Sequence, residues 1–361
     1  MIENIEKNKL SNIPGFDGHE QVVRFSDPHS GLLGFVAIHN TALGPAVGGT
    51  RMNLFKTEQE ALEDALKLSR AMTYKCALSG LHYGGGKAVI IGDPHKKSSE
   101  LLEAYGVIIE NLGGKIRTGV DAGVEDEDVS VMATKTKYMI GVVNPGVEKL
   151  HTSDMAALGV FHSIKTCFKI KFGSNDLSGK TIAIRGVGKL GGELLRLLYE
   201  RGAKIFAADI ETQRMNSLKS KYPGLIEVPV TEIHKVECDL FSPCSLGGEI
   251  NSQTILELKT KIICGGSNNQ LARPEMAHEL YNQGVLYAPD YVVNAGGLIN
   301  VVDELEPDGY RKERVLQRVE NIGDILENIL HESEKEKMPA SLIADRMAGR
   351  IIYDQTLKKL K

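Results

Sequence analysis

A glycine pattern in the middle of the chain constrains the fold more than any other feature. The segment TIAIRGVGKLGGELLRLL at 181–198 spaces Gly186, Gly188 and Gly191 as G-x-G-x-x-G, directly after a strand-like run and at the start of a helical one. Gly186 allows a tight turn, Gly188 lets a pyrophosphate approach backbone N–H groups, and Gly191 permits close packing of helix on strand. The pattern predicts a β–α unit that binds a dinucleotide.

An acidic residue follows this unit at the expected distance. The run KIFAADI at 204–210 reads as the next strand, and Asp209 lies at its end. A carboxylate there accepts hydrogen bonds from ribose hydroxyls and repels a 2′-phosphate, which favours NAD over NADP, although Arg214 lies nearby. A plain turn with a strand-end cap is the alternative. The candidate cofactor-binding residues are Gly186, Val187, Gly188, Lys189, Leu190, Gly191 and Asp209.

Strand-like and helical runs alternate through both halves of the 361-residue chain. The second half predicts a doubly wound parallel sheet, a Rossmann domain, with further strands near 225, 239, 261 and 285. The first half alternates as well, so we predict an α/β protein of two domains. We expect an N-terminal α/β domain for substrate binding, catalysis and oligomerisation at 1–150, the Rossmann domain at 151–330, and C-terminal helices packing on the domain boundary at 331–361.

Composition excludes several classes of function. A net charge of -4 and a pI near 6.2 argue against nucleic-acid binding. No apolar stretch is long enough for a membrane span or a signal peptide, so we expect a cytoplasmic protein. The five cysteines form no C-x-x-C pair, which favours reduced thiols and predicts no metal site.

The first half carries charged residues at the ends of its predicted elements. Lys75 lies near the end of a helix that starts at Thr57, Lys87 starts a strand after the glycine turn 84–86, and Asp121 follows another strand. If they converge, one lysine can act as a base near neutral pH while the other stays charged and holds a carboxylate. Taken singly, each lysine is more simply interpreted as an ordinary surface residue.

Besides the glycine pattern, the chain contains a series of long motifs: LGPAVGGTRM (43–52), ALEDALKLSRAMTYKCALSG (61–80), GGGKAVIIGDP (84–94), TGVDAG (118–123), CDLFSPCSLGG (238–248), GGSNNQL (265–271) and YAPDYVVNAGGLINVVDEL (287–305). Together these motifs resemble those of the Glu/Leu/Phe/Val amino-acid dehydrogenase family, in particular the bacterial leucine and phenylalanine dehydrogenases. The resemblance covers the chain from about His19 to the C-terminal helices.

The resemblance implies NAD-dependent oxidative deamination of an L-amino acid to its 2-oxo acid and ammonia by a homo-oligomer, commonly an octamer. It implies that Lys75 holds the substrate carboxylate, that Lys87 activates the hydrolytic water, and that Asp121 moves protons at the amino nitrogen. Asn294 would orient both substrate and nicotinamide. The backbone at Gly48 and Gly49 would lie beside the substrate, with a plain turn as the alternative there.

Arg51 and three expected pocket residues bear on which substrate the chain binds. Arg51 is either a carboxylate anchor or, as we expect, structural. Val47 replaces a lysine that holds the distal carboxylate in the glutamate enzymes, so an apolar substrate is expected. Gly119 and Leu298 match the phenylalanine enzymes, where a small residue at Gly119 would leave room for a ring. Leucine or another branched-chain residue, phenylalanine and tryptophan all stay open as substrates.

The chain departs from the family pattern just before its long connecting helix. Asp154 and Ala156 stand where relatives often carry proline and a threonine whose hydroxyl lies near the nicotinamide. Ala156 cannot make that hydrogen bond, so a catalytically impaired NAD-binding paralogue is one alternative. A 2-hydroxy-acid dehydrogenase is another, although no histidine lies in a comparable motif.

Overall fold

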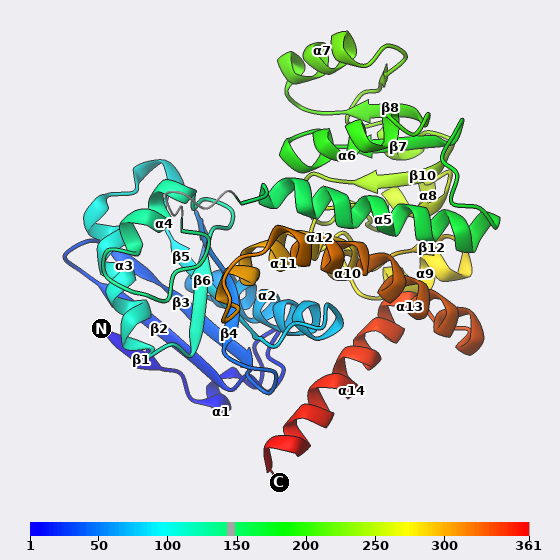
Figure 1. Cartoon of the computed structure of the whole chain (residues 1–361). Helices are drawn as coiled ribbons and strands as arrows, with labels where there is room; N and C mark the ends of the chain where they lie inside the picture. Colours follow the sequence, from blue (N-terminus) through cyan, green and yellow to red (C-terminus); the bar gives the residue numbers. More distant parts are fainter. Residues whose placement is uncertain (143–148, 361) are drawn as a thin grey trace. The chain divides into compact units, whose positions relative to one another are not determined.

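The computed structural model describes residues 1–142 and 149–360, which form two compact units (Figure 1). The first unit contains the described part of Met1–Glu148 together with Glu304–Gly309 and Ala348–Lys361. The second contains Lys149–Asp303 and Tyr310–Met347. Each unit has its own six-stranded sheet, so the predicted α/β architecture is confirmed.

The first unit is built on a mixed sheet in the order β1-β2-β3-β5-β4-β6. The pairs β1–β2, β2–β3 and β3–β5 are antiparallel, whereas β4 pairs in parallel with both β5 and β6. The elements are β1 Ile2–Asn4, α1 Lys7–Leu10, β2 Gln21–Asp27, β3 Leu32–Asn40, β4 Ala46–Asn53, α2 Glu58–Leu78, β5 Gly84–Ile91, the 3-10 turn η1 Pro94–Lys96, α3 Ser99–Asn111, β6 Ile116–Gly119 and α4 Asp126–Met132.

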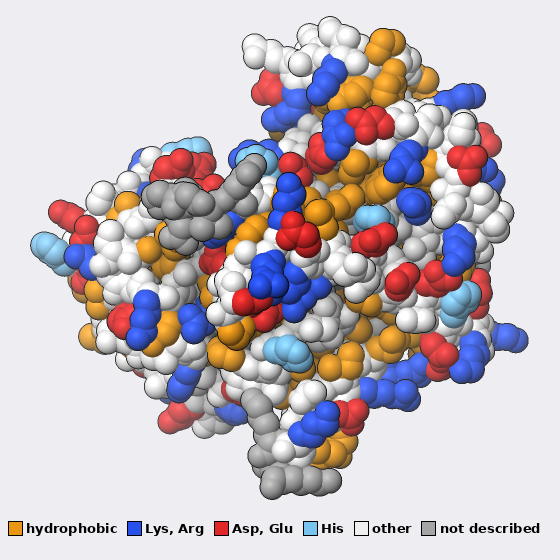
Figure 2. Space-filling model, in the orientation of Figure 1, with side chains coloured by type: hydrophobic (Ala, Val, Ile, Leu, Met, Phe, Trp, Pro, Cys, Tyr) orange, Lys and Arg blue, Asp and Glu red, His pale blue; other side chains and the backbone are white. Residues whose placement is uncertain are grey.

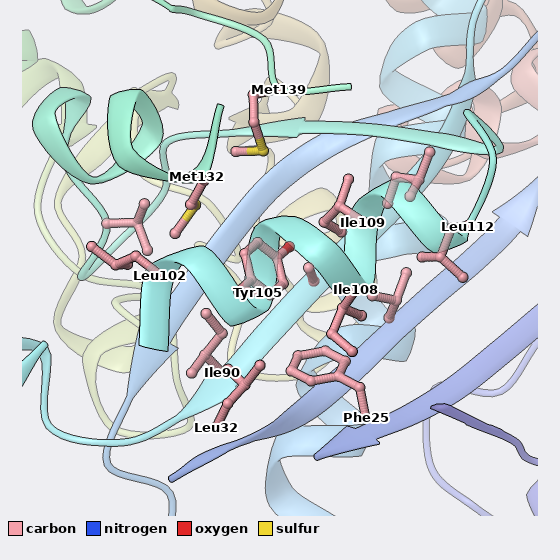
Figure 3. Close-up of a cluster of buried hydrophobic side chains, with 14 of the residues drawn as sticks. Phe25, Leu32, Ile90, Leu102, Tyr105, Ile108, Ile109, Leu112, Met132 and Met139 are labelled. Atoms are coloured by element: carbon pink, nitrogen blue, oxygen red, sulfur yellow. The ribbon is translucent and has the colours of Figure 1, made fainter. Parts of the chain in front are cut away.

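Successive residues of a strand point to opposite faces of the sheet. Both faces of this sheet carry apolar side chains, and helices cover each of them. On one face Phe25 and Ile90 pack against Tyr105 and Ile109 of α3, in the cluster of Figure 3. On the other face Val89 packs with Leu66 and its neighbours on α2. The two apolar layers hold the central strands β3 and β5 between them.

The glycine run 84–86 is part of a strand, so our prediction of a turn there was wrong. All three glycines lie inside β5 and are buried between β3 and β4. A Cβ on Gly85 would lie 2.1 Å from the backbone nitrogen of Thr73 in α2. Gly85 is required because α2 lies directly on the strand, whereas a Cβ on Gly84 or Gly86 would meet other parts of the first unit. Lys87 follows them in the middle of β5.

The second unit contains an all-parallel sheet in the order β12-β11-β10-β7-β8-β9, which is the order of a Rossmann domain. Its elements are α5 Thr152–Phe172, β7 Thr181–Arg185, α6 Lys189–Tyr199, β8 Lys204–Ala208, α7 Thr212–Lys221, β9 Ile226–Glu227, η2 Ile233–Lys235, β10 Cys238–Pro243, α8 Thr254–Glu257, β11 Thr260–Ile263, α9 Met276–Asn282, β12 Leu286–Tyr287, α10 Asp290–Val293, α11 Gly296–Val302, η3 Asp303–Leu305, α12 Lys312–Glu320, α13 Ile322–Glu336 and α14 Ala340–Leu360, the last continuing into the first unit.

The long helix α5 packs along α6, α11 and α13 within this unit. It ends at Gly173, which adopts the left-handed conformation that commonly closes a helix. Its contact with α11 is close, because a Cβ on Gly296 would lie 2.0 Å from the carbonyl oxygen of Met155. The small residues of the 294–297 segment are therefore explained by helix packing.

The surface carries charges of both signs. On the face shown in Figure 2, Lys and Arg side chains are interspersed with Asp and Glu.

Within the described residues, no helix is both long enough and apolar enough to cross a bilayer.

Candidate functional site

Lys87, which is buried, and Asp121, which is half-buried, form an ion pair in the first unit. The Lys87 Nζ lies 2.8 Å from Asp121 Oδ2, and Lys87 is only 5% exposed. Lys87 shares a face of β5 with Val89, the face covered by α2, and Asp121 follows β6. Two of the three charged residues singled out in the first half therefore meet directly.

Arg51 binds the same carboxylate. Its Nε lies 2.9 Å from Asp121 Oδ2, and its other nitrogen Nη1 lies 3.0 Å from an oxygen of Asp64 on α2. Burial alone would raise the pKa of Asp121, but the two cations Lys87 and Arg51 together hold that pKa well below its ordinary value. Asp121 is therefore ionised at neutral pH when no substrate is bound.

Lys75 and the two glycines lie on elements around this ion pair. Lys75 is in the last turn of α2, the helix that packs on β5. Gly48 and Gly49 are inside β4, between β5 and β6, so they do not form a plain turn. A Cβ on Gly49 would lie 2.8 Å from the Cβ of Asp121, which places this backbone directly beside the carboxylate.

Gly119 is explained by packing of the main chain. It ends β6 opposite Gly49, and a Cβ on it would lie 2.4 Å from the carbonyl oxygen of Ile140. The segment of Ile140 is bonded to the strand, because the Ile140 N–H donates to the Thr118 carbonyl at 2.8 Å. The expectation that a glycine here opens room for an aromatic ring is wrong in this chain: the position is filled by backbone.

The glycine pattern forms the turn between β7 and α6 in the second unit. Gly186 has a φ of 86°, in the left-handed region that favours glycine, and a Cβ on Gly191 would lie 2.0 Å from the Gly186 carbonyl oxygen. Around Gly188, in contrast, a Cβ would meet nothing within 4 Å. The turn is closely packed at Gly186 and Gly191 and open at Gly188, which lies at the positive N-terminal end of α6. An open backbone at this end of a helix suits a pyrophosphate.

Asp209 follows β8 and holds this turn in place. Its Oδ2 accepts the Val187 N–H at 2.7 Å, and its Oδ1 accepts the Glu211 N–H at 2.9 Å and a guanidinium N–H of Arg214 at 2.8 Å. Although burial raises it, these three donors lower the pKa of Asp209 below its ordinary value. Each carboxylate oxygen has more than one acceptor site, so a ribose hydroxyl can still bind there.

Asn294 ends α10 with an oriented amide group. Its Nδ2 donates to the Gly266 carbonyl at 3.2 Å and to Asn268 Oδ1 at 2.7 Å, which fixes the orientation of the amide. The Oδ1 atom is buried and has no hydrogen-bond partner within the described residues. A buried acceptor of this kind is costly unless a ligand donates to it. The residues of the second unit thus fit a nicotinamide dinucleotide.

Leu298 and Ala156 lie on α11 and α5, two helices that pack against each other. Leu298 is half-buried on α11, between the buried Gly297 and Ile299. Ala156 is buried on α5, where the Cβ built on Gly297 would lie 3.6 Å from its methyl group. No three His, Cys, Asp or Glu side chains in residues 1–142 and 149–360 gather so that they could hold a metal ion.

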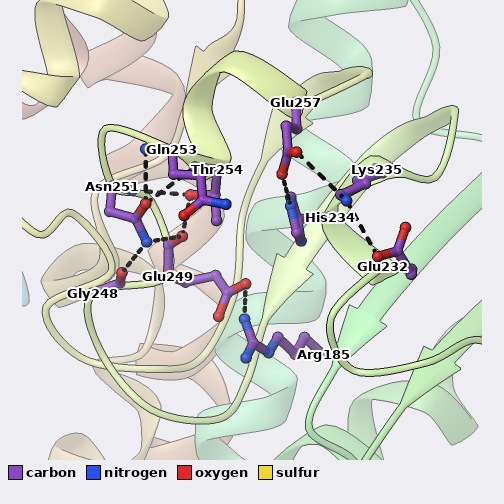
Figure 4. A network of polar contacts seen from close by, with 10 residues as sticks. All are labelled: Arg185, Glu232, His234, Lys235, Gly248, Glu249, Asn251, Gln253, Thr254 and Glu257. Carbon is purple, nitrogen blue, oxygen red and sulfur yellow. Dashed lines mark hydrogen bonds and ion pairs between the residues drawn. The ribbon is translucent and has the colours of Figure 1, made fainter.

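Several bonds around the site have no signal in the sequence. The Arg51 link between Asp64 and Asp121 joins residues far apart in the chain. Figure 4 shows a similar ion pair in the second unit, where Arg185 at the end of β7 binds Glu249 in the loop after β10. Such pairs depend on which strands become neighbours, and a single sequence does not give that order.

The chain is similar to known dehydrogenases over nearly its whole length. Residues 19–144 match the sequence profile of the Glu/Leu/Phe/Val dehydrogenase dimerisation domain, and residues 207–356 match that of Glutamate/Leucine/Phenylalanine/Valine dehydrogenase. It is 43% identical to a leucine dehydrogenase of Geobacillus stearothermophilus and 45% identical to a phenylalanine dehydrogenase of Thermoactinomyces intermedius. Both alignments cover 95% of this chain and 92% of the relative.

A solved structure agrees with these matches. The L-tryptophan dehydrogenase from Nostoc punctiforme superposes with a TM-score of 0.81 at 37% identity, over 97% of this chain and 99% of that one.

Proposed function

The chain belongs to the Glu/Leu/Phe/Val dehydrogenase family of amino-acid dehydrogenases, and we propose that it uses NAD to deaminate an apolar L-amino acid to its 2-oxo acid and ammonia. The observation that carries the proposal is the buried pair of Lys87 and Asp121. A lysine next to an ionised carboxylate is an arrangement suited to proton transfer at an amino nitrogen and at an attacking water.

The first unit binds and deprotonates the substrate. We assign to Lys75 the α-carboxylate, because a flexible ammonium at a helix end reaches an anion beside the strands. Gly49 lets the backbone of β4 lie against Asp121, and we assign the substrate amino group to this carboxylate. Asp121 then takes a proton from the amino nitrogen and returns one when ammonia leaves.

Water is activated at Lys87. After the α-carbon has lost its hydride, the substrate is an iminium, and water must add to its carbon. In its uncharged form Lys87 takes a proton from that water as the water adds to the carbon. Asp121 then protonates the amino nitrogen, the carbon–nitrogen bond breaks as the new hydroxyl group passes its proton to the Asp121 carboxylate, and both residues release their protons as the products leave. Burial in β5 keeps the lysine from bulk solvent throughout these steps.

The second unit holds the dinucleotide. The N–H groups at the start of α6 and the turn Gly186–Gly188 would bind the pyrophosphate, Asp209 the adenosine ribose, and Asn294 the nicotinamide end. When bound, the nicotinamide ring supplies the acceptor for the hydride of the α-carbon. We favour NAD because Asp209 repels a 2′-phosphate, even though Arg214 lies against it.

The substrate is apolar in this proposal. Val47 is fully buried in β4, and a buried substrate carboxylate near it would have no cation there. Leucine, phenylalanine and tryptophan enzymes are all similar to this chain, so the preferred side chain is set by positions other than Gly119. The match to a dimerisation domain supports a homo-oligomer, and we propose an octamer.

A substrate panel tests this function. NADH formation is followed at alkaline pH with L-leucine, L-isoleucine, L-valine, L-phenylalanine, L-tryptophan and L-glutamate, each with NAD and with NADP. We expect turnover with at least one apolar amino acid, a preference for NAD, and no turnover with glutamate. Binding of NADH without any turnover would instead identify an impaired paralogue.

A further inference from the structure

Arg51 bonds the reacting carboxylate through one defined atom. Its Nε and the Nζ of Lys87 lie 2.9 Å and 2.8 Å from the same oxygen, Oδ2 of Asp121. Two cations on one oxygen fix the rotation of the carboxylate and direct the other oxygen, Oδ1, away from both. An acid residue that moves a proton needs such a defined direction.

The opposite side of Arg51 is anchored as firmly. Its Nη1 bonds both oxygens of Asp64, at 3.3 and 3.0 Å, and Asp64 belongs to α2. The side chains of Arg51, Asp64 and Asp121 are each about one-fifth to one-quarter exposed. Arg51 is therefore a fixed bridge from β4 to the helix on one side and to the carboxylate on the other.

We propose that Arg51 is a positioning residue for the deamination: held by Asp64, it fixes Oδ2 of Asp121 together with Lys87 so that Oδ1 faces the substrate amino nitrogen. This inference deepens the proposed function and rests on it. Arg51 does not touch the substrate in this account. It acts through Asp121, and its positive charge lies next to the Lys87–Asp121 pair.

The charges around the pair give opposite predictions for two substitutions. The groups involved are Lys87 on β5, Arg51 on β4 and Asp64 on α2, all facing the α2 side of the sheet. Arg51→Gln removes a positive charge next to the Lys87–Asp121 pair, so we expect the pair to lose its proton at higher pH. Asp64→Asn removes a negative charge behind Arg51, so the proton is lost at lower pH. A purely structural role for Arg51 gives no such opposition.

The experiment measures kcat/KM against pH for both variants and for Arg51→Lys, using the best amino acid of the panel. We expect the ascending limb to move up by about one pH unit in Arg51→Gln, about tenfold in rate at fixed pH, and down by a few tenths of a unit in Asp64→Asn. Arg51→Lys keeps the charge and should restore at least half of the shift. If Arg51→Gln does not fold, Asp64→Asn alone tests the proposal: a downward shift of its ascending limb supports the role of Arg51, and no shift or an upward shift contradicts it.

The matched control is Arg24→Gln. Arg24 also reaches from a strand to an acid of α2, since its Nε lies 2.7 Å from Glu58, but it has no contact with Asp121. It should leave the pH profile unchanged. A folded Arg51→Gln with the wild-type profile, or shifts in the same direction for Arg51→Gln and Asp64→Asn, would overturn the inference.

A second readout separates this inference from the function itself. Carbamylation of Lys87 by cyanate, followed by peptide mass spectrometry across the pH range, needs no turnover. If the protein deaminates no amino acid, the proposed function is wrong. If the pH midpoint of Lys87 carbamylation still shifts in opposite directions in Arg51→Gln and Asp64→Asn, the influence of Arg51 on the Lys87–Asp121 pair holds without that function. Turnover by the wild type with unshifted variants would remove only the inference.

Discussion

Replacing Lys87 by methionine removes the proposed base and keeps its aliphatic stem in β5. The Nζ lies 2.8 Å from Asp121, and the side chain is almost fully buried. Loss of a general base lowers kcat by about a hundred- to ten-thousandfold. Removing one partner of a buried ion pair costs about 3–5 kcal/mol of unfolding free energy, and we expect about half of that here, because Arg51 still binds the carboxylate.

The assay separates catalysis from folding and from cofactor binding. NADH formation gives kcat, urea denaturation gives the loss of stability, and quenching of NADH fluorescence gives the affinity of the second unit. We expect NADH affinity within about twofold of wild type, since the glycine turn and Asp209 lie in the other unit.

The control for this variant is Lys97→Met. Lys97 forms a partly buried ion pair with Asp128 and donates to the Gly123 carbonyl at 3.1 Å, two residues after Asp121. It therefore reproduces both the loss of a lysine–aspartate pair and any loosening of this loop. The account is refuted if folded Lys87→Met keeps more than about a tenth of the wild-type rate, or if Lys97→Met loses as much activity.

Three further predictions concern Gly119, Asp209 and Asp121. Gly119→Ala should lower the unfolding free energy by about 1–3 kcal/mol in urea, because its Cβ meets the Ile140 carbonyl, and should leave the ranking of amino-acid substrates unchanged. Asp209→Ala should reduce the preference for NAD over NADP, measured as a ratio of kcat/KM, by at least about tenfold, and an unchanged ratio would contradict the assigned role. The lowered pKa of Asp121 stabilises the fold above the ordinary carboxyl pKa, and this contribution is lost as pH falls. Asp121→Asn should therefore be less stable at neutral pH but show a weaker loss of stability between about pH 5 and 3, measured by denaturant midpoints.

The second unit was predictable from sequence because its signals are local. The glycine spacing, the strand before it and Asp209 after the next strand all lie within one β–α–β segment. Local patterns of this kind specify the turn, the helix start and the direction of the strands. The strands expected near 225, 239, 261 and 285 are all present and all parallel.

The first unit was less predictable because its site depends on strand order. The mixed sheet places β4 between β5 and β6, and only this order brings Arg51, Lys87 and Asp121 together. The glycines show the same limit. Gly85 and Gly119 look like a turn and a pocket residue in the sequence, but each is required by backbone or helix atoms that come from elsewhere in the chain.

Measuring all products of one reaction in parallel shows whether the protein deaminates an amino acid. NADH, ammonia and the 2-oxo acid are quantified from a single incubation of the protein with NAD and its best L-amino acid. Oxidative deamination predicts equal amounts of the three, and none of them with Lys87→Met. NADH formed without ammonia, or no product from any apolar amino acid, would contradict the claim.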